Sequence, residues 1–271
     1  MTISTFFLGQ VSALEEANIT SITSEMGGHE KKFLVDWERP RQYWQATDNR
    51  TEQIIVIDLV TPGKYVGIYL RGLNFGDAEQ SITIESNIAA NAWANPETSS
   101  TVRVERDVLV ARRQRAFFFK ADRSTITHRY IRLRISADQV TDDGGNYRIG
   151  VLALIRRPTE VEVRAAIGLT VQAPRIVSES GIGHADVTNV GERILTMQLP
   201  WDWLWDQQLG ADINEEDTMM ALSPNNDVPL VVCRDVERPD RAYLVRRVGD
   251  IQINSSGGVG ASMPLAYTEV G

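Results

Sequence analysis

Hydrophobic and polar residues alternate over much of the first 160 residues, and this period of two restricts the fold more than any other feature of the sequence. The alternation predicts β-strands at residues 53–60, 65–70, 81–86, 101–110, 115–121, 129–136 and 147–156. Turn-forming residues separate these segments, as in Thr61-Pro62-Gly63. Because no long helical pattern lies between them, we expect an all-β fold, with an antiparallel sandwich rather than alternating strands and helices.

The rest of the chain predicts a second, smaller β-rich domain. Strands are expected at 193–199, 228–234 and 241–253, with a short helix in either 204–211 or 214–222. A chain of 271 residues is long enough for two modest domains. We therefore expect three parts: an N-terminal arm or edge segment (1–28), a β-sandwich (29–160) and a β-rich assembly domain (161–271).

The motifs of common enzyme classes are missing from the sequence. It contains no phosphate-binding loop, no nucleophile elbow, no zinc-protease motif and no paired Cys-x-x-Cys. The three histidines (His29, His128 and His184) are far apart in the chain, and Cys233 follows an apolar run that favours a buried thiol. We expect a protein without catalytic activity, metal or cofactor. A glycan-active enzyme stays open as an alternative, and it would need two carboxylates about 5–10 Å apart.

The number of cysteines and the net charge restrict the cellular compartment and the classes of binding partner that we expect. One cysteine cannot form an intrachain disulfide, and the first 16 residues lack the basic start and unbroken apolar stretch of a signal peptide. No apolar run approaches the ~20 residues that a membrane-spanning helix needs. We therefore expect assembly in a reducing cytoplasm, without a membrane span. The net charge of −8 argues against nucleic acid as a partner.

Two groups of aromatic residues are candidates for binding. Trp37, Tyr43 and Trp44 precede the first strong strand, and their rings suit either stacking on a sugar or packing inward under a lid of the sandwich. In the second region three tryptophans alternate along the chain: Trp201, Trp203 and Trp205. In an extended segment they share one edge, which suits either a protein interface or the core of the smaller domain.

Loop residues with side-chain oxygens form two further clusters. Asp142, Asp143 and Asn146 belong to one loop, and Asn74 and Asp77 belong to another. Such oxygens can hold Ca²⁺ together with backbone carbonyls. The same residue types are also favoured in turns, where their side chains bond to nearby backbone groups. Both interpretations are open, and we favour the turn.

Charge is distributed unevenly along the chain. Between residues 103 and 134 ten basic residues stand against three acidic ones, a net charge of +7, and they include Arg112, Arg113 and Arg115. Between residues 179 and 227 ten acidic residues stand against one arginine, a net charge of −9, and they include Glu215, Glu216 and Asp217. Complementary stripes of this kind suit contacts between neighbouring copies of the chain. Two ordinary solvated faces are the alternative.

The segment YWQATDNRTEQIIVIDLVTPGKYVGIYLRGLNFGDAEQSITIESN resembles the start of galactose-binding-like domains, the discoidin or carbohydrate-binding jelly rolls. The later segments RYIRLRIS and YRIGVLALIRR are similar to the closing half of such domains. The resemblance covers residues 30–157. It implies a jelly roll that contacts glycan through Trp37, Tyr43, Trp44 and the loop of Asn74. The cysteine pair and signal peptide of secreted members are missing here.

The C-terminal segments RILTMQLPWDWLWDQQLG and PLVVCRDVERPDRAYLVRRVGDIQ resemble distal-tail-type proteins at the tail tip of long-tailed bacteriophages. This resemblance implies a structural ring protein, commonly a hexamer, that joins the tail tube to the tip hub of a virion assembled in the bacterial cytoplasm. The arginines and acidic residues named above, with Trp201, Trp203 and Trp205, are then expected at subunit interfaces. Host surface polysaccharide is a possible further partner. A stand-alone carbohydrate-binding module or adhesin is the alternative function.

Overall fold

A computed structural model describes residues 4–12, 14–36, 42–62, 65, 67–75, 80–106, 114–119, 127–163, 168–172, 175–179, 185–189, 194–203, 230–233, 242–248, 254–256 and 260–269. Within these ranges the chain is mostly β, with two short 3-10 helices, η1 (Glu16–Asn18) and η2 (Lys31–Leu34). None of the helices described is long and apolar enough to span a bilayer.

The strands of the first 163 residues are β1 (Ser4–Ser12), β2 (Ile19–Ile22), β3 (Trp44–Gln45), β4 (Gln53–Asp58), β5 (Gly67–Leu73), β6 (Ser81–Asn87), β7 (Thr98–Arg103), β8 (Glu105–Arg106), β9 (Gln114–Phe119), β10 (Tyr130–Ile135), β11 (Arg148–Ile149) and β12 (Val151–Val163). The later strands are β13 (Gly168–Gln172), β14 (Arg175–Glu179), β15 (Ala185–Asn189), β16 (Ile194–Trp203), β17 (Leu230–Cys233), β18 (Ala242–Val248), β19 (Asn254–Ser256) and β20 (Gly260–Glu269).

Each of the seven segments with alternating residues overlaps one or more strands of the structure, which confirms the all-β prediction for this part of the chain. The three strands expected in the second region overlap β16, β17 and β18. The helix expected at 204–211 or 214–222 lies outside the described residues.

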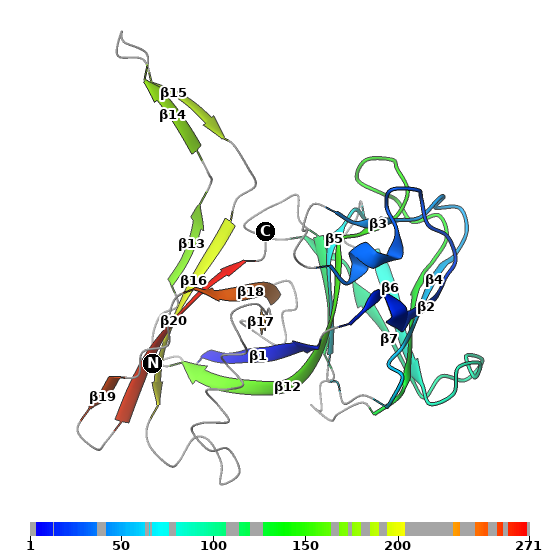
Figure 1. Ribbon diagram of the computed structural model, residues 1–271, viewed down its shortest axis with the longest axis horizontal. Helices are drawn as coiled ribbons and strands as arrows, with labels where there is room; N and C mark the ends of the chain where they lie inside the picture. Colours follow the sequence, from blue (N-terminus) through cyan, green and yellow to red (C-terminus); the bar gives the residue numbers. More distant parts are fainter. Residues whose placement is uncertain are drawn as a thin grey trace.

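Two sheets build the sandwich, and Figure 1 shows them packed face to face. One sheet has five antiparallel strands in the order β2-β4-β10-β6-β7. The other contains β5 and β12, which belong to a longer antiparallel sheet. The order of that sheet is β13-β16-β20-β18-β17-β1-β12-β5-β9-β8, with β19 attached to β20. The hairpin of β14 and β15 forms a separate two-stranded ribbon that extends away from the sandwich.

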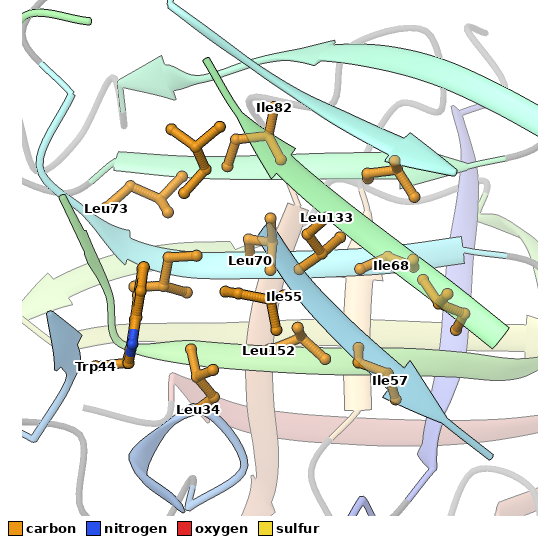
Figure 2. Close-up of a cluster of buried hydrophobic side chains, with 14 of the residues drawn as sticks. Leu34, Trp44, Ile55, Ile57, Ile68, Leu70, Leu73, Ile82, Leu133 and Leu152 are labelled. Carbon is orange, nitrogen blue, oxygen red and sulfur yellow. The ribbon is translucent and has the colours of Figure 1, made fainter. Parts of the chain in front are cut away.

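The core of the sandwich lies between the five-stranded sheet and strands β5 and β12 (Figure 2). Burial alternates along β4 and β10, so that Ile55 and Ile57 of β4 and Leu133 of β10 point inward while their neighbours face solvent. Ile68 and Leu152 approach them from the opposite sheet. The alternation of hydrophobic and polar residues in these strands therefore arises because only one face of the sheet is packed in the core.

Strand β5 and residues 151–155 of β12 are buried on both faces. Tyr69 and Ala153 alternate with the core residues around them, and both are fully buried outside the sandwich core. Buried residues of β18 and β20, among them Leu244 and Tyr267, also lie outside the sandwich core. This arrangement explains why burial does not alternate along β5, where nearly every residue is buried.

A contact between two glycines sets the path of the chain where β11 leads into β12. Gly72 has a φ of +71°, and a Cβ atom at this position would lie 3.0 Å from Cα of Gly150. The backbone N–H of Gly150 donates to the carbonyl of Arg71 at 2.8 Å. Because neither residue has a side chain, the two backbones can approach closely enough for β12 to pair with β5 directly after β11 ends.

The parts of the chain differ in extent from those expected. Within residues 1–28, β2 is at the edge of the five-stranded sheet, but β1 lies inside the long sheet between β17 and β12. The boundary expected at residue 160 falls inside β12, because Thr159 to Val163 still pair with β1. The segment is a strand rather than a linker because β1 offers it a complete antiparallel ladder.

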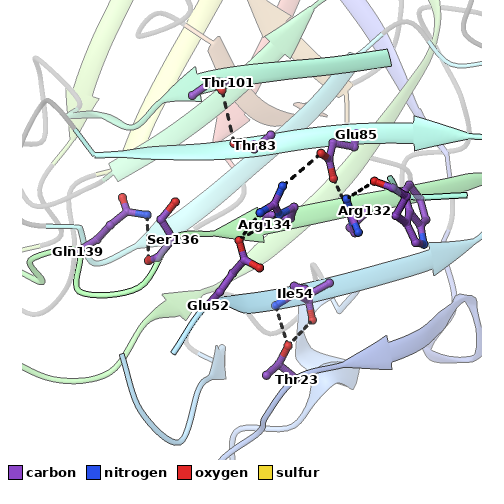
Figure 3. A network of polar contacts seen from close by, with 11 residues as sticks. Thr23, Glu52, Ile54, Thr83, Glu85, Thr101, Arg132, Arg134, Ser136 and Gln139 are labelled. Atoms are coloured by element: carbon purple, nitrogen blue, oxygen red, sulfur yellow. Dashed lines mark hydrogen bonds and ion pairs between the residues drawn. The ribbon is translucent and has the colours of Figure 1, made fainter. Parts of the chain in front are cut away.

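The outer face of the five-stranded sheet carries a chain of ion pairs (Figure 3). Arg134 donates to Glu52 at 2.6 Å and contacts Glu85 at 3.4 Å, and Glu85 also pairs with Arg132. Nearby, Arg129 holds Asp58 with two hydrogen bonds of 2.6 and 2.8 Å. Three arginines of the basic stripe are therefore neutralised within the chain, and they are not available to an acidic stripe on a neighbouring copy.

Candidate functional site

Four segments that are far apart in the sequence meet at one end of the sandwich. They carry His29, Tyr43, Asn74 and the loop of residues 141–148. The pairing of β3 with β11 determines which side chains are available there. It turns Trp44 and Ile149 into the core, so the alternate residues Tyr43 and Arg148 lie on the outer side. We call His29, Tyr43, Asp143 and Arg148 the loop-end cluster.

Asn74 holds the segments together from beneath. Its Nδ2 donates to the backbone carbonyl of Asn146 at 2.9 Å and to Oδ1 of Asp143 at 3.2 Å. Its Oδ1 accepts the backbone N–H of Arg148 at 2.8 Å. The side chain is only 8% exposed, so Asn74 supports the cluster and does not offer a surface to a ligand.

Asp143 is held as a carboxylate. Its partial burial alone would raise the pKa, but the backbone N–H of Gly145, the charge of Arg148 and the amide of Asn74 together keep the pKa of Asp143 below its ordinary value. The ion pair between Arg148 Nη1 and Asp143 Oδ2 is 2.8 Å long, and both side chains are about one-third exposed. The cluster therefore presents a charged donor and a charged acceptor side by side at the surface.

Tyr43 adds an aromatic ring beside this ion pair. The guanidinium carbon of Arg148 lies 5.0 Å from the centre of the Tyr43 ring, and the ring of His29 stacks on Tyr43 at 4.3 Å. Both rings are partly exposed. An apolar ring next to a hydrogen-bond donor and acceptor is the arrangement that suits a sugar, which has an apolar face of C–H groups and a polar edge of hydroxyls.

The residues predicted to bind glycan take different places. Trp44 is fully buried, and its Nε1 donates to the carbonyl of Ser24 at 3.1 Å. An indole with no exposed face cannot stack on a ligand. The prediction that Trp44 contacts glycan is therefore wrong, and Trp44 is a core residue. Asn74 is a supporting residue, as described above. Tyr43 belongs to the loop-end cluster, and Trp37 lies outside the described residues.

Sequence reasoning missed His29 and Arg148. His29 had no neighbouring partner in the sequence, and Arg148 looked like one polar position of an alternating strand. The register of β3 against β11, which joins positions about 100 residues apart, brings Arg148 beside Tyr43. A signal was present in the loop before it, because Asp143 and Asn146 lie within the five residues that precede this arginine.

The loop considered for Ca²⁺ is a turn stabilised by its own side chains. Oδ1 of Asp143 accepts the N–H of Gly145 at 3.0 Å, and Oδ2 accepts from Arg148. Thr141 Oγ1 donates to the carbonyl of Gly145 at 2.7 Å. These contacts hold Asp143 within the turn, and the described part of the chain contains no group of three or more metal-binding side chains. Asp77 lies outside the described residues.

Most residues predicted at subunit interfaces lie outside the described residues: Arg112, Arg113, Trp205, Glu215, Glu216 and Asp217. The backbone of Arg115 lies in β9, opposite Arg71 of β5. Trp201 and Trp203 lie in the extended strand β16, where their backbones pair with Met263 and Ala261 of β20. The interface itself stays a prediction.

Comparisons with known proteins give matches at the level of structure alone. No family model and no curated protein matches the chain. The V110M mutant of chitosan-binding module 1, from a chitosanase/glucanase of Paenibacillus sp. IK-5, matches with 17% identity and a TM-score of 0.38, over 55% of this chain and 99% of that chain.

Two further solved structures are similar over about the same share. The lectin domain of lectinolysin, complexed with Lewis B antigen, has 9% identity and a TM-score of 0.34, covering 54% of this chain and 99% of that chain. CBM32-3 from a family 31 glycoside hydrolase of Clostridium perfringens has 17% identity and a TM-score of 0.36, covering 54% and 95%. These values say nothing about a ligand of this chain, and nothing among the matches indicates a phage tail protein.

Proposed function

We propose that the sandwich binds glycan at the loop-end cluster, as a carbohydrate-binding module does, and that it does so without catalysis. One observation carries the proposal: the partly exposed ring of Tyr43 lies against Arg148, whose guanidinium is paired with the partly exposed Asp143. The chitosan-binding module and the lectin domain named above are known for glycan binding, but the proposal rests on the side chains of this chain.

The chemistry assigns each residue of the cluster a task. The faces of the Tyr43 ring contact His29 and Arg148, so its exposed edge would give apolar contact to the C–H groups of a sugar ring. Asp143 would accept a hydrogen bond from one hydroxyl, and Arg148 would donate one to a neighbouring hydroxyl. Asn74 and the turn of residues 141–145 hold these groups in place before a ligand arrives, which reduces the entropy lost on binding.

The test is an array of defined oligosaccharides probed with the full-length chain, followed by titration calorimetry on the oligosaccharides that bind. Tyr43→Ala should weaken binding about tenfold or more, because it removes the apolar surface under the sugar. Tyr130→Ala is the matched control. Tyr130 is also partly exposed beside an arginine, with Arg129 5.0 Å from its ring centre, but it lies on β10 outside the cluster.

Tyr130→Ala should bind like the wild type. No binding by the wild-type chain to any oligosaccharide would contradict the proposal. Equal losses of affinity in the two tyrosine variants would show that the sugar does not bind at the loop-end cluster.

The phage tail-tip role is a finer proposal for the same chain. It rests on the resemblance of the C-terminal segments, and it would place the glycan-binding sandwich on a ring of identical subunits in a virion. Tail-tube and tip-hub proteins would then be partners. Its test is the oligomeric state of the purified chain, described in the Discussion.

A further inference from the structure

The surface of the ion pair between Asp143 and Arg148 is open because residue 145 has no side chain. A Cβ atom on Gly145 would lie 3.1 Å from Oδ1 of Asp143 and 3.7 Å from Nη2 of Arg148. A side chain at this position would therefore touch both charged groups at once. Glycine leaves that space to solvent or to a ligand.

Arg148 has unused hydrogen-bonding capacity next to this space. Its Nη1 pairs with Asp143, while the described contacts give Nη2 no acceptor. Arg129 and Arg134 show what the same side of a guanidinium does elsewhere in this protein, since each uses Nε and Nη2 to hold a carboxylate. In Arg148 the Nη2 atom next to Gly145 is left for another acceptor.

Gly144, the neighbouring glycine, differs from Gly145 both in backbone conformation and in the space around a Cβ atom. Gly144 has a φ of +64°, which a residue with a side chain adopts only with strain, and a Cβ atom there would meet nothing within 4 Å. Gly145 lies outside the left-handed region. The turn thus needs glycine at residue 144 for its backbone conformation, whereas at residue 145 glycine keeps the ion pair uncovered.

We infer that Gly145 is a specificity-determining position, where the polar edge of a bound sugar takes the space of the missing side chain. The inference rests on the proposed function and narrows it to sugars that offer two adjacent free hydroxyls on one ring. One hydroxyl donates to Asp143 and the next accepts from Nη2 of Arg148. Adjacent ring hydroxyl oxygens are separated by about the length of one hydrogen bond. Oδ2 of Asp143 lies at the same distance, 2.8 Å, from Nη1 of Arg148, and Nη1 and Nη2 belong to the same guanidinium.

The experiment compares Gly145→Ala, Gly145→Val and Gly144→Ala with the wild type on the same oligosaccharide array. Titration calorimetry measures affinity for the oligosaccharides that the wild type binds, and thermal unfolding measures stability. Gly145→Ala should weaken binding about tenfold or more, the usual effect of losing a hydrogen bond to a charged group. Gly144→Ala, whose Cβ atom meets nothing within 4 Å, should lower the Tm by about 2–4 °C through backbone strain.

The results distinguish a failure of the proposed glycan binding from a failure of the inference about Gly145. If the wild-type chain binds no oligosaccharide, the proposed function fails and the inference fails with it. If the wild type binds and both Gly145 variants bind equally well, only the inference is overturned. Wild-type binding of rings whose adjacent hydroxyls are all methylated would also overturn it. If Gly145→Val does not fold, Gly145→Ala still decides the question.

Discussion

Tyr65 brings a phenol hydroxyl into the apolar interior of the sandwich. The residue is 1% exposed and belongs to the main hydrophobic cluster. Burial raises the pKa of Tyr65 to about 12, because the phenolate would lose its hydration. A folded-state pKa above the ordinary value of 10 means that folding stability is complete below pH 10 and falls as the pH rises toward 12.

We therefore expect the free energy of unfolding to drop by up to about 3 kcal/mol between pH 9 and pH 12 through this one residue. Tyr65→Phe should remove that part of the loss, since phenylalanine has no proton to release. Denaturant unfolding at a series of pH values measures both proteins. The same decline in the variant as in the wild type would show that other groups cause it.

The adjacent residues Tyr43 and Trp44 show how far residue-scale prediction reaches. The sequence placed both in one aromatic segment before the first strong strand and left two interpretations open. The structure divides the pair, because strand β3 turns Trp44 into the core and leaves Tyr43 partly exposed. The partner strand β11 is about 100 residues away, so neither composition nor local spacing could tell which ring would be buried.

At the scale of elements, strands β4, β6 and β10 are joined across their outer face by charge as well as by backbone hydrogen bonds. Glu85 of β6 is the centre of this network, with a side chain 5% exposed between Arg132, 13% exposed, and Arg134. Arg132 also lies 4.6 Å from the centre of the Trp93 ring, which covers it. A carboxylate so well enclosed is costly to remove, because two guanidinium groups lose their common partner.

Glu85→Gln should lower the free energy of unfolding by about 3 kcal/mol, as expected when one member of a buried ion pair is lost. Glu52→Gln is the matched control. Glu52 pairs with the same Arg134, but both side chains are 37% exposed, so the loss should stay below about 1 kcal/mol. Urea unfolding of both variants tests the expectation. Similar losses in the two would mean that burial does not govern the strength of these pairs.

The strands themselves were predictable, since one apolar face imposes the period of two along β4, β6 and β10. Strands such as β1 and β20 were not identified, because their sequences do not alternate in the same way. The loop-end cluster could be predicted only in part. Asn74 and Tyr43 were named, but Arg148 joins them through strand register, which sequence spacing does not reveal.

At the scale of the whole molecule, the long sheet links the sandwich to the rest of the chain. Strand β12 pairs with β5 through residues 151–155 and with β1 through residues up to Val163. In the order β17-β1-β12-β5 each strand pairs with the next, and this order leads from the second region into the sandwich. The division expected at residue 160 follows from where the two groups of predicted strands end and begin, and such a pattern carries no information about a partner strand.

Self-association through charge is a prediction for the whole molecule. Reversing Arg112, Arg113 and Arg115 to glutamate should shift the full-length chain toward smaller species, most strongly at low salt where charge attraction is least screened. Size-exclusion chromatography with light scattering measures the change. Arg50→Glu is a suitable control, because Arg50 is exposed and lies outside the stripe. A wild-type monomer, or a triple variant with unchanged mass, would contradict the prediction.

The continuity of β12 has a mechanical consequence for a protein that holds a surface glycan. A pull on a sugar bound near Arg148 enters the chain three residues before β12 begins. The strand passes this force along its 13 residues into β1, whose antiparallel register resists sliding through many hydrogen bonds at once. Such a connection extends far less under force than a flexible linker, so the sandwich and the long sheet would move together under tension.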